Sequence, residues 1–369
     1  MTSDAGSWIY ATLDDVGKDS FGLVSMALDS NNKVHISYYN DTNGDLMYAT
    51  NADGPWASYI LDSAGDVGVH SSIAMDSNDK VHIGYVDSTN RDLEYITNAS
   101  GVWSHSGVDS AGEVGAYVSI ALDSSNKVHM SYYDSTNHDL KYANNTLGPW
   151  LTTTIDSLGD VGAFTSIAVD SNNKVHISYW DFPNQDMKYA TNAGGSWTCL
   201  ALDSIVNVGA ATSIAIDSNN KVHLSYCDAT NGDLKYATNK DGLWACYTVD
   251  SMSSVGIGSS IAVDSNHHVH ISYYDWTNYH LKYATNAGGD WANYALDSVG
   301  THAYSSSIAV DSDNHVHIGY YDTTNGFLRY AYDTESIPEF GTAGVVMIIT
   351  ATVCIFVALR RTTPPTKKE

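Results

Sequence analysis

The chain is poor in basic residues. Its 17 lysines and arginines stand against 42 aspartates and glutamates, which gives a formal net charge of −25 over 369 residues. Because no basic patch is available to meet phosphate groups, nucleic-acid binding is excluded. Only five of the acidic residues are glutamate and the rest are aspartate, which is common in turns and unfavourable within helices. Such a surface suits salty water or the collection of cations, and solubility alone is the simpler interpretation.

Cysteine is scarce as well, with Cys199, Cys227, Cys246 and Cys354 as the four thiols. Cys199 and Cys246 occupy equivalent positions of neighbouring repeats, too far apart for the Cα separation below about 7 Å that a disulfide requires. Cys227 and Cys246 fall two strands apart, at roughly 9–10 Å. We therefore expect no disulfide bonds, and cysteine does not indicate the cellular compartment.

Helical periodicity is missing before residue 341, and a repeat of 47 residues without insertion or deletion takes its place. Each repeat reads as four short strands separated by turn sequences; in the second they are Ser72–Asp76, Val81–Val86, Leu93–Thr97 and Trp103–Val108. This period with four strands per repeat is typical of a β-propeller blade. A Val-His pair marks the second strand of every repeat, with the histidines at His35, His82, His129, His176, His223, His270 and His317.

A tryptophan with the same period predicts how the ring closes. It opens the fourth strand of six repeats, but the seventh copy is Trp8, and the last repeat breaks off after Tyr332 without an outermost strand. The segment Trp8–Leu13 is therefore predicted to pair with Leu328–Tyr332 and to leave no open sheet edge. An open stack of repeats would need atypical capping repeats, which this chain lacks. We expect an all-β, seven-bladed propeller over residues 7–333 that closes as a monomeric ring.

One long uncharged run stands near the C-terminal end. Residues 341–359 are 19 residues without a charge, long enough to cross a bilayer as a helix. The basic tail 360–369 follows, so we expect a cytoplasmic C-terminus and a propeller outside the cell. The linker 334–340 joins the propeller to this span.

The linker contains a recognisable tripeptide. Pro338, Glu339 and Phe340 precede Gly341, the first residue of the span, and basic residues end the chain. This order resembles the PEF-CTERM class of archaeal protein-sorting signals. The resemblance covers the last 32 residues and implies processing by an archaeosortase and display on the cell surface. A plain C-terminal anchor is the alternative interpretation.

The N-terminal residues 1–7 show no signal-peptide pattern. A propeller outside the cell then requires a start upstream of Met1, and the alternative is a tail-anchored protein with a cytoplasmic propeller, which the basic tail opposes. Three glycosylation sequons, at Asn40, Asn98 and Asn144, lie near predicted turns and fit exposure, although chance could supply them in a chain rich in Asn and Thr.

The repeated histidines do not predict a metal site or a catalytic centre. Equivalent strands of successive blades diverge from the axis, so these imidazoles should lie too far apart to share one ion, and we expect them to form hydrogen bonds between blades. Sialidases, which are propellers too, grip a carboxylate with three arginines. The repeats hold only Arg91 and Arg329 and lack an Asp-box, so that activity is excluded. A two-carboxylate glycosidase is not excluded, but no residue is predicted to be catalytic.

Calcium is the one ion that the turns could hold. Four loops between the second and third strands each offer two carboxylates and an asparagine. None of these loop sequences matches an EF-hand, and capping of the turn by aspartate explains the pattern more simply. No other cofactor is expected. The four loops are Asp87–Asp92, Asp134–Asp139, Asp181–Asp186 and Asp228–Asp233.

Departures from the repeat gather in two kinds of loop that should emerge on one face. The loop between the second and third strands varies most at the x positions of a largely repeated Asp-x-Thr-Asn-x-Asp frame, and the loop between blades varies beside the central channel. Exposed aromatic residues at such positions suit stacking on sugar rings or peptide side chains. Relaxed drift explains the variation equally well. The outer candidates are Trp180, Phe182, Trp276 and Tyr279, and the channel-rim candidates are His70, Tyr117, Phe164 and Tyr304.

Three functions remain open at this point. The favoured one is a non-enzymatic, surface-anchored binding or adhesion module for an extracellular glycan or a surface protein. A second is an extracellular hydrolase or lyase with a site at the channel rim. A third is a structural component of the cell envelope. The fold alone does not decide among them.

Overall fold

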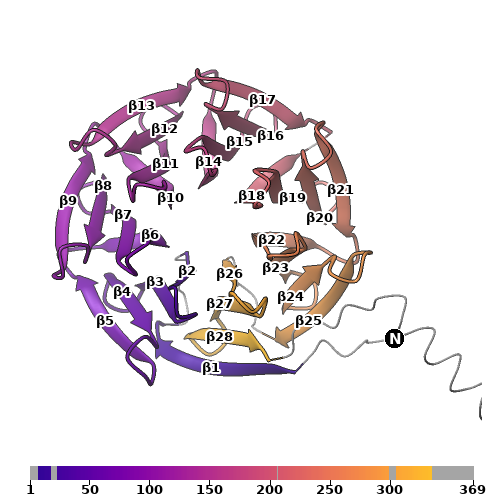
Figure 1. Ribbon diagram of the computed structural model, residues 1–369, viewed down its shortest axis with the longest axis horizontal. Coiled ribbons are helices and arrows are strands. Elements are labelled where there is room, and N and C mark those ends of the chain that lie inside the picture. The colour runs from indigo at the N-terminus through magenta and orange to yellow at the C-terminus, as the bar shows by residue number, and fades with distance from the viewer. Residues whose placement is uncertain (1–6, 18–22, 206, 299–304, 335–369) are drawn as a thin grey trace, which may run out of the picture.

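The computed structural model describes residues 7–17, 23–205, 207–298 and 305–334. These residues form 28 strands in seven antiparallel four-stranded sheets, which stand as blades around a central axis (Figure 1). We number the blades 1 to 7 along the chain, and the first strand of each blade lies innermost. The prediction of a seven-bladed propeller is confirmed.

The strands recur with the period of the sequence. Blade 1 comprises β2 (Ser25–Leu28), β3 (Val34–Asn40), β4 (Asp45–Thr50) and β5 (Ala57–Asp62). Blades 2, 3 and 4 comprise β6 (Val67–Met75), β7 (Val81–Asp87), β8 (Asp92–Thr97), β9 (Ser104–Asp109), β10 (Val114–Leu122), β11 (Val128–Asp134), β12 (Asp139–Asn144), β13 (Leu151–Asp156), β14 (Val161–Val169), β15 (Val175–Asp181), β16 (Asp186–Thr191) and β17 (Thr198–Asp203). Blades 5, 6 and 7 comprise β18 (Val208–Ile216), β19 (Val222–Asp228), β20 (Asp233–Thr238), β21 (Ala245–Asp250), β22 (Val255–Val263), β23 (Val269–Asp275), β24 (His280–Thr285), β25 (Ala292–Ser298), β26 (Ser306–Val310), β27 (Val316–Asp322) and β28 (Phe327–Asp333), with β1 (Trp8–Asp15) as the last strand.

The N-terminal strand closes the ring as predicted. β1 pairs antiparallel with β28, with Trp8 opposite Asp333 and Asp15 opposite Phe327, and it forms the outer edge of blade 7 (Figure 1). The Trp8 ring packs edge-on against Tyr283 of blade 6 at 5.5 Å, and the Tyr10 hydroxyl donates a 2.9 Å hydrogen bond to the Leu296 carbonyl. The closing strand is therefore bound to two blades.

Both faces of a blade are buried, although the second strand alternates hydrophobic residues with histidine and serine. In β3, Val34, Ile36 and Tyr38 are at most 1% exposed, and His35 on the opposite face is only 5% exposed. Each hydrophobic cluster takes its members from two neighbouring blades, so the core consists of seven layers between blades rather than one centre. The second strand of every blade also contributes a fully buried tyrosine to these layers, namely Tyr38, Tyr85, Tyr132, Tyr179, Tyr226, Tyr273 and Tyr320.

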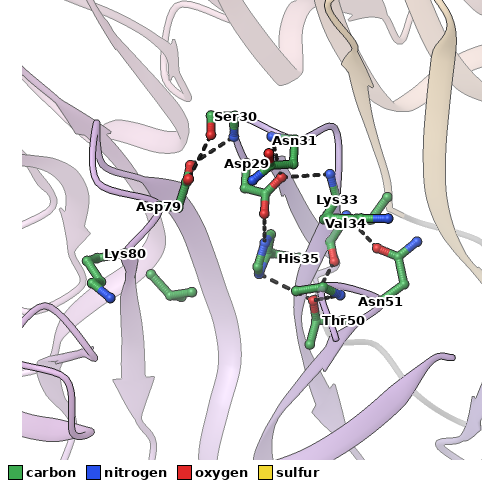
Figure 2. A network of polar contacts seen from close by, with 12 residues as sticks. Asp29, Ser30, Asn31, Lys33, Val34, His35, Thr50, Asn51, Asp79 and Lys80 are labelled. Carbon is green, nitrogen blue, oxygen red and sulfur yellow. Dashed lines mark hydrogen bonds and ion pairs between the residues drawn. The ribbon is translucent and has the colours of Figure 1, made fainter. Parts of the chain in front are cut away.

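The repeated histidines bond within their own blades, so the expectation of hydrogen bonds between blades is wrong. His35 Nδ1 lies 2.5 Å from the Tyr48 hydroxyl on the adjacent strand. Its Nε2 lies 3.5 Å from Asp29 Oδ2 in the preceding turn (Figure 2). His129 repeats this arrangement with Tyr142 and Asp123. Both partners belong to the histidine's own blade, where a strand spacing of about 4.8 Å brings side chains of adjacent strands within hydrogen-bonding reach.

A belt of serines joins the innermost strands into a circle. The Ser25 hydroxyl accepts a 3.1 Å hydrogen bond from the backbone N–H of Ile73 in the next blade, and the Ser307 hydroxyl accepts one of 3.0 Å from Met26 across the closure. The same bond links every adjacent pair of blades, which leaves each hydroxyl proton available to a further acceptor. The belt consists of Ser25, Ser72, Ser119, Ser166, Ser213, Ser260 and Ser307.

The predicted C-terminal segments lie outside the described residues. This applies to the sorting tripeptide at Pro338, to the span 341–359 and to the basic tail. Within the described part of the chain, no helix is long and apolar enough to cross a membrane. The three described cysteines, Cys199, Cys227 and Cys246, are free thiols.

Candidate ligand-binding face

The two kinds of variable loop lie on one face of the ring, as predicted. The Ser88 N–H, in the loop between β7 and β8, donates a 2.8 Å hydrogen bond to the Asp66 carbonyl in the loop between blades 1 and 2. The Asp66 N–H in turn donates to the Thr89 hydroxyl at 2.8 Å. We call this side, where the innermost strands begin, the loop face.

The rim candidates occupy strands rather than loops, which corrects the sequence interpretation. β6 begins at Val67 instead of the predicted Ser72, so His70 lies within it, and Tyr117 and Phe164 lie within β10 and β14. The pairing register shifts beside Tyr117 and Phe164, where φ is +56° and +53°. This irregularity redirects these two side chains relative to the regular pleat. Tyr304 lies outside the described residues.

The rim side chains form one continuous wall. The rings of His70 and Tyr117 stack with centroids 4.8 Å apart, and those of Tyr117 and Phe164 lie 4.5 Å apart. Leu23 holds the equivalent position in blade 1, so the wall covers four successive blades. The remaining equivalents are the small residues Ala211, Gly258 and Ser305. The rim is therefore large and mostly aromatic on one side and small on the other.

A cavity of about 630 Å³ occupies the centre of the loop face. The rim wall and the serine belt both line it. On the small side it continues outward over blade 5, where its lining includes Cys227, Ala229, Gly232 and Ser254. We call this extension the blade 5 groove. It exists because blade 5 carries Ala229 and Gly232 where its two neighbours carry larger side chains.

The outer aromatic candidates stand on the two blades that flank this groove. Blade 4 contributes Phe182, which is 56% exposed and packs edge-on against Trp180 at 5.1 Å. Blade 6 contributes Tyr279, 42% exposed, and the partly buried Trp276, which packs against Tyr274 at 6.1 Å. Trp180 also approaches Phe164 at 6.0 Å, so the blade 4 pair continues the rim wall. The blade 6 pair stands apart from that wall, on the far side of the groove.

Polar groups without partners gather at the junction of blades 4 and 5. At four other junctions a hydroxyl of the innermost strand bonds a serine of the preceding blade, as Thr165 does with Ser131 at 2.8 Å. At this junction Ser178 Oγ and Thr212 Oγ1 are buried and have no hydrogen-bond partner among the described residues. Trp180 Nε1 is in the same condition. Thr212 lines the cavity, so a polar group within it could satisfy that hydroxyl.

The cavity is uncharged at neutral pH. None of its described lining residues is Asp, Glu, Lys or Arg. Burial lowers the pKa of His70 to about 4, and burial raises the pKa of Tyr117, so both are neutral. Burial likewise raises the pKa of the Cys227 thiol to about 12. A pair of carboxylates for acid–base chemistry is thus missing from the described lining.

The remaining predicted sites keep their status as predictions. The first aspartate of the loop frames caps its own turn; Asp87 Oδ1 and Oδ2 accept bonds from the backbone and side chain of Asn90. Calcium binding there stays untested. Of the sequon asparagines, Asn40 and Asn144 are each 7% exposed and Asn98 is partly buried, and glycosylation also stays a prediction.

Comparison with known proteins shows the fold but no family. No family model matches the chain, and no curated protein matches its sequence. An ulvan-degrading polysaccharide lyase superposes with a TM-score of 0.59 at 11% identity, over 88% of this chain and 96% of that one. The Aleuria aurantia lectin, complexed with Fucα1-6GlcNAc, gives 0.52 at 13% identity, over 75% and 96%. An α-L-arabinofuranosidase from Fusarium graminearum gives 0.52 at 12% identity, over 87% and 96%.

Sequence reasoning missed the groove and the serine belt. Ala229 and Gly232 are visible as departures in the loop alignment, but small residues do not stand out among aromatic ones. Leu23 was overlooked at the rim because it precedes the first complete repeat segment. The sequence does contain a serine every 47 residues from Ser25. A small residue repeated on an inner strand is equally expected from packing, so this pattern did not by itself predict a belt of hydrogen bonds.

Proposed function

We propose that this protein is a non-enzymatic binding module that recognises a neutral glycan chain in the central cavity and the blade 5 groove. The single observation that carries this proposal is the outward continuation of the cavity over Ala229 and Gly232, between aromatic residues of blades 4 and 6. An elongated ligand fits such a channel better than a compact one. The ligand would run from the rim wall outward across blade 5.

The chemistry of the lining favours sugar over other ligands. Sugar rings stack on aromatic faces through their C–H groups, and their hydroxyls match hydroxyl and amide partners. Here His70, Tyr117 and Phe164 offer the stacking side, and the serine belt and Thr212 offer hydroxyl groups. The chain carries a net charge of −25, so an anionic polysaccharide would be repelled. A neutral glycan meets no such penalty.

Binding without turnover is supported by what lines the cavity. Glycoside hydrolysis commonly uses two carboxyl groups that flank the scissile bond. The described lining offers hydroxyls, aromatic rings and a neutral imidazole instead. Two of the structural neighbours act on carbohydrates and one is a lectin, at identities of 11–13% that carry the fold alone.

The location of the protein remains a proposal from the sequence. The uncharged span at 341–359 and the tripeptide before it support a propeller anchored outside the cell, with archaeosortase processing of the tail. A binding module held at the surface could use several weak contacts together, which raises apparent affinity without new contacts.

The test fills the groove with side chains that the fold already accepts. The double variant Ala229→Trp/Gly232→Tyr places on blade 5 the residues that blade 6 carries as Trp276 and Tyr279. Gly232 has φ +73°, and Tyr279 has φ +59°, so the tyrosine is tolerated at that position. The matched control is Ser88→Trp, at the same loop position on blade 2.

The full chain, its double variant and the control are compared on an array of neutral, anionic and peptide ligands. We expect saturable binding of a neutral glycan, at least tenfold weaker for the double variant and unchanged for Ser88→Trp. Equal binding by all three proteins would refute the groove. Preference for peptides would point to a protein ligand instead, and release of sugar fragments from a polysaccharide panel would refute the non-enzymatic proposal.

A further inference from the structure

The turn between the first and second strands of each blade has a common polar design. In blade 1, Asp29 Oδ1 accepts hydrogen bonds from the backbone N–H groups of Asn31 and Lys33, at 2.9 and 2.8 Å. Asp29 Oδ2 faces Nε2 of the repeated His35 (Figure 2). Lys33 follows in the turn, and blades 2 to 5 carry lysine at the same position. Because lysine is positively charged, its presence in this turn disfavours a bound cation.

Blade 7 departs from this design at two positions of a single turn. Asp313 stands where the other blades carry asparagine or serine, and His315 stands where blades 1 to 5 carry lysine. Each change introduces a metal-ligating group, and the second also removes a positive charge. Blade 6 shares only the second change. It carries His268 at the lysine position but keeps asparagine, as Asn266, where blade 7 has Asp313.

The two new side chains converge on the conserved aspartate. One ligand atom each of Asp311, Asp313 and His315 lies within 4.8 Å of the other two. His315 Nδ1 lies 3.3 Å from Asp311 Oδ2. From the other side, His317 Nε2 lies 3.3 Å from the same oxygen, on a side chain that is only 4% exposed. Two imidazoles and two carboxylates thus meet at one turn.

Part of this cluster is rigid and part can adjust. The Asp311 side chain is 5% exposed, and its Oδ1 is held by the backbone N–H groups of Asp313 and His315 at 2.9 and 2.8 Å. The Asp313 residue is exposed, and the His315 side chain is 22% exposed. These two can move toward an ion while Asp311 Oδ2 keeps its place, which brings the ligands to the roughly 2.0–2.2 Å that zinc requires.

We propose that Asp311, Asp313 and His315 bind a divalent transition-metal ion of the Zn²⁺ type, with His317 as the buried neighbour that orients Asp311. Mixed imidazole and carboxylate ligands suit Zn²⁺, whereas Ca²⁺ and Mg²⁺ prefer oxygen ligands alone. The contact with the His317 imidazole fixes the orientation of the Asp311 carboxylate, which is itself a metal ligand. The turn lies at the opposite end of the strands from the loop face, so this site is independent of the proposed glycan site.

The chain provides its own variants for the test. Asp313→Asn and His315→Lys restore residues that other blades carry at these positions, so neither should disturb the fold. Asn266→Asp in blade 6 does the reverse, because it adds the missing aspartate and reproduces there the three metal-ligating side chains of blade 7. The other two are already in place, with His268 Nδ1 2.9 Å from Asp264 Oδ2. The untagged full chain is stripped with chelator and titrated with ZnCl₂ in a calorimeter, and Co²⁺ absorption reports the ligand geometry.

We expect one saturable Zn²⁺ site in the natural chain, at least tenfold weaker in each blade 7 variant and lost in the double variant. Asn266→Asp should add a second equivalent of Zn²⁺. Undiminished binding by the Asp313→Asn/His315→Lys protein would show that other surface histidines hold the metal and would overturn the proposal. Absence of saturable binding in the natural chain would overturn it as well. Circular dichroism confirms that each variant is folded.

Discussion

His70 accepts a 3.2 Å hydrogen bond at Nδ1 from the backbone N–H of Tyr117, one blade further along the ring. The two rings stack at 4.8 Å with their planes 24° apart. Nδ1 must therefore be unprotonated, and the proton of the neutral imidazole belongs on Nε2. The cavity wall thus depends on a neutral histidine, which burial favours by lowering the pKa of His70 to about 4.

This relationship predicts a pH dependence of stability. In the unfolded chain His70 takes up a proton near pH 6.5, but in the folded protein it does so only near pH 4, so the unfolded state binds more protons in between. Stability should therefore fall as the pH decreases below about 6.5. Burial also lowers the pKa of His35, His82 and His129, which adds to the same trend.

The contribution of His70 is separated with His70→Phe, which places in blade 2 the residue that blade 4 carries as Phe164. Urea unfolding at pH 7 and pH 5 should show a smaller difference for this variant than for the natural chain. An NMR titration of the His70 ring should give a midpoint well below 6.5. A midpoint at 6.5, or equal pH sensitivity of both proteins, would contradict the interpretation.

Glu94 should be replaceable by lysine with a gain in stability. Blades 3 to 6 carry a lysine at this position of the third strand, as with Lys188, whose Nζ lies 2.5 Å from Asp156 and 3.5 Å from Asp181. Blade 2 carries Glu94 instead, and its pKa is raised by burial and by Asp92, Asp87 and Asp62. Glu94→Lys replaces this repulsion with a charged hydrogen bond, which should add about 1–2 kcal/mol to the free energy of unfolding.

The measurement is urea unfolding at pH 7, with Lys188→Glu as the reverse exchange. That variant should lose about 3 kcal/mol, because it leaves buried carboxylates without their cation. The gain from Glu94→Lys should shrink at low pH, since protonated Glu94 no longer repels its neighbours. A destabilised Glu94→Lys protein would show that the blade 2 site has adapted to glutamate.

Removal of residues 1–15 should open the ring. Without β1, the backbone groups of β28 that now pair with it are exposed, and exposed edges pair with other chains. The truncated protein should aggregate, or melt at least about 5 °C lower in a calorimetric scan. The control lacks residues 1–6 and keeps β1. If both truncated proteins melt like the full chain, β1 does not hold the ring together.

The aromatic side chains beside the groove should contribute to affinity, and Trp276, which packs against the core between blades 6 and 7, should also contribute to folding. Trp276→Ser with Tyr279→Gly gives blade 6 the kind of small residues found on other blades. Stacking contacts are worth about 0.5–1.5 kcal/mol each, so loss of both should weaken glycan binding by about fivefold to about 150-fold. Isothermal titration with the ligand identified on the array provides the measurement.

The control for that prediction is His223→Ala. His223 Nδ1 lies 2.7 Å from the Tyr236 hydroxyl, so its removal deletes this buried hydrogen bond and the packing of a buried ring, and should lower stability by roughly 1–3 kcal/mol. Affinity should remain unchanged once the variant is folded. Normal binding by the blade 6 variant would indicate that the loop aromatics reflect drift.

The architecture was predictable because it depends on local patterns that the sequence repeats. The constant 47-residue interval, the four strand-like segments and the displaced Trp8 were enough for seven blades and for closure by β1, since an unpaired outer strand has one available edge. The rim positions of His70, Tyr117 and Phe164 followed from the same repeat. Their place within strands did not, because a bulge depends on pairing with the neighbouring strand.

The site itself was decided by the tertiary structure. The groove arises where Ala229 and Gly232 are small between neighbours that are large, and only the ring places blades 4, 5 and 6 so that this difference becomes a continuous space. The partners of His35 were likewise set by strand spacing, which the one-dimensional repeat does not contain. Repetition in the sequence therefore determined the scaffold, and the absence of side-chain volume at one blade determined where a ligand can enter.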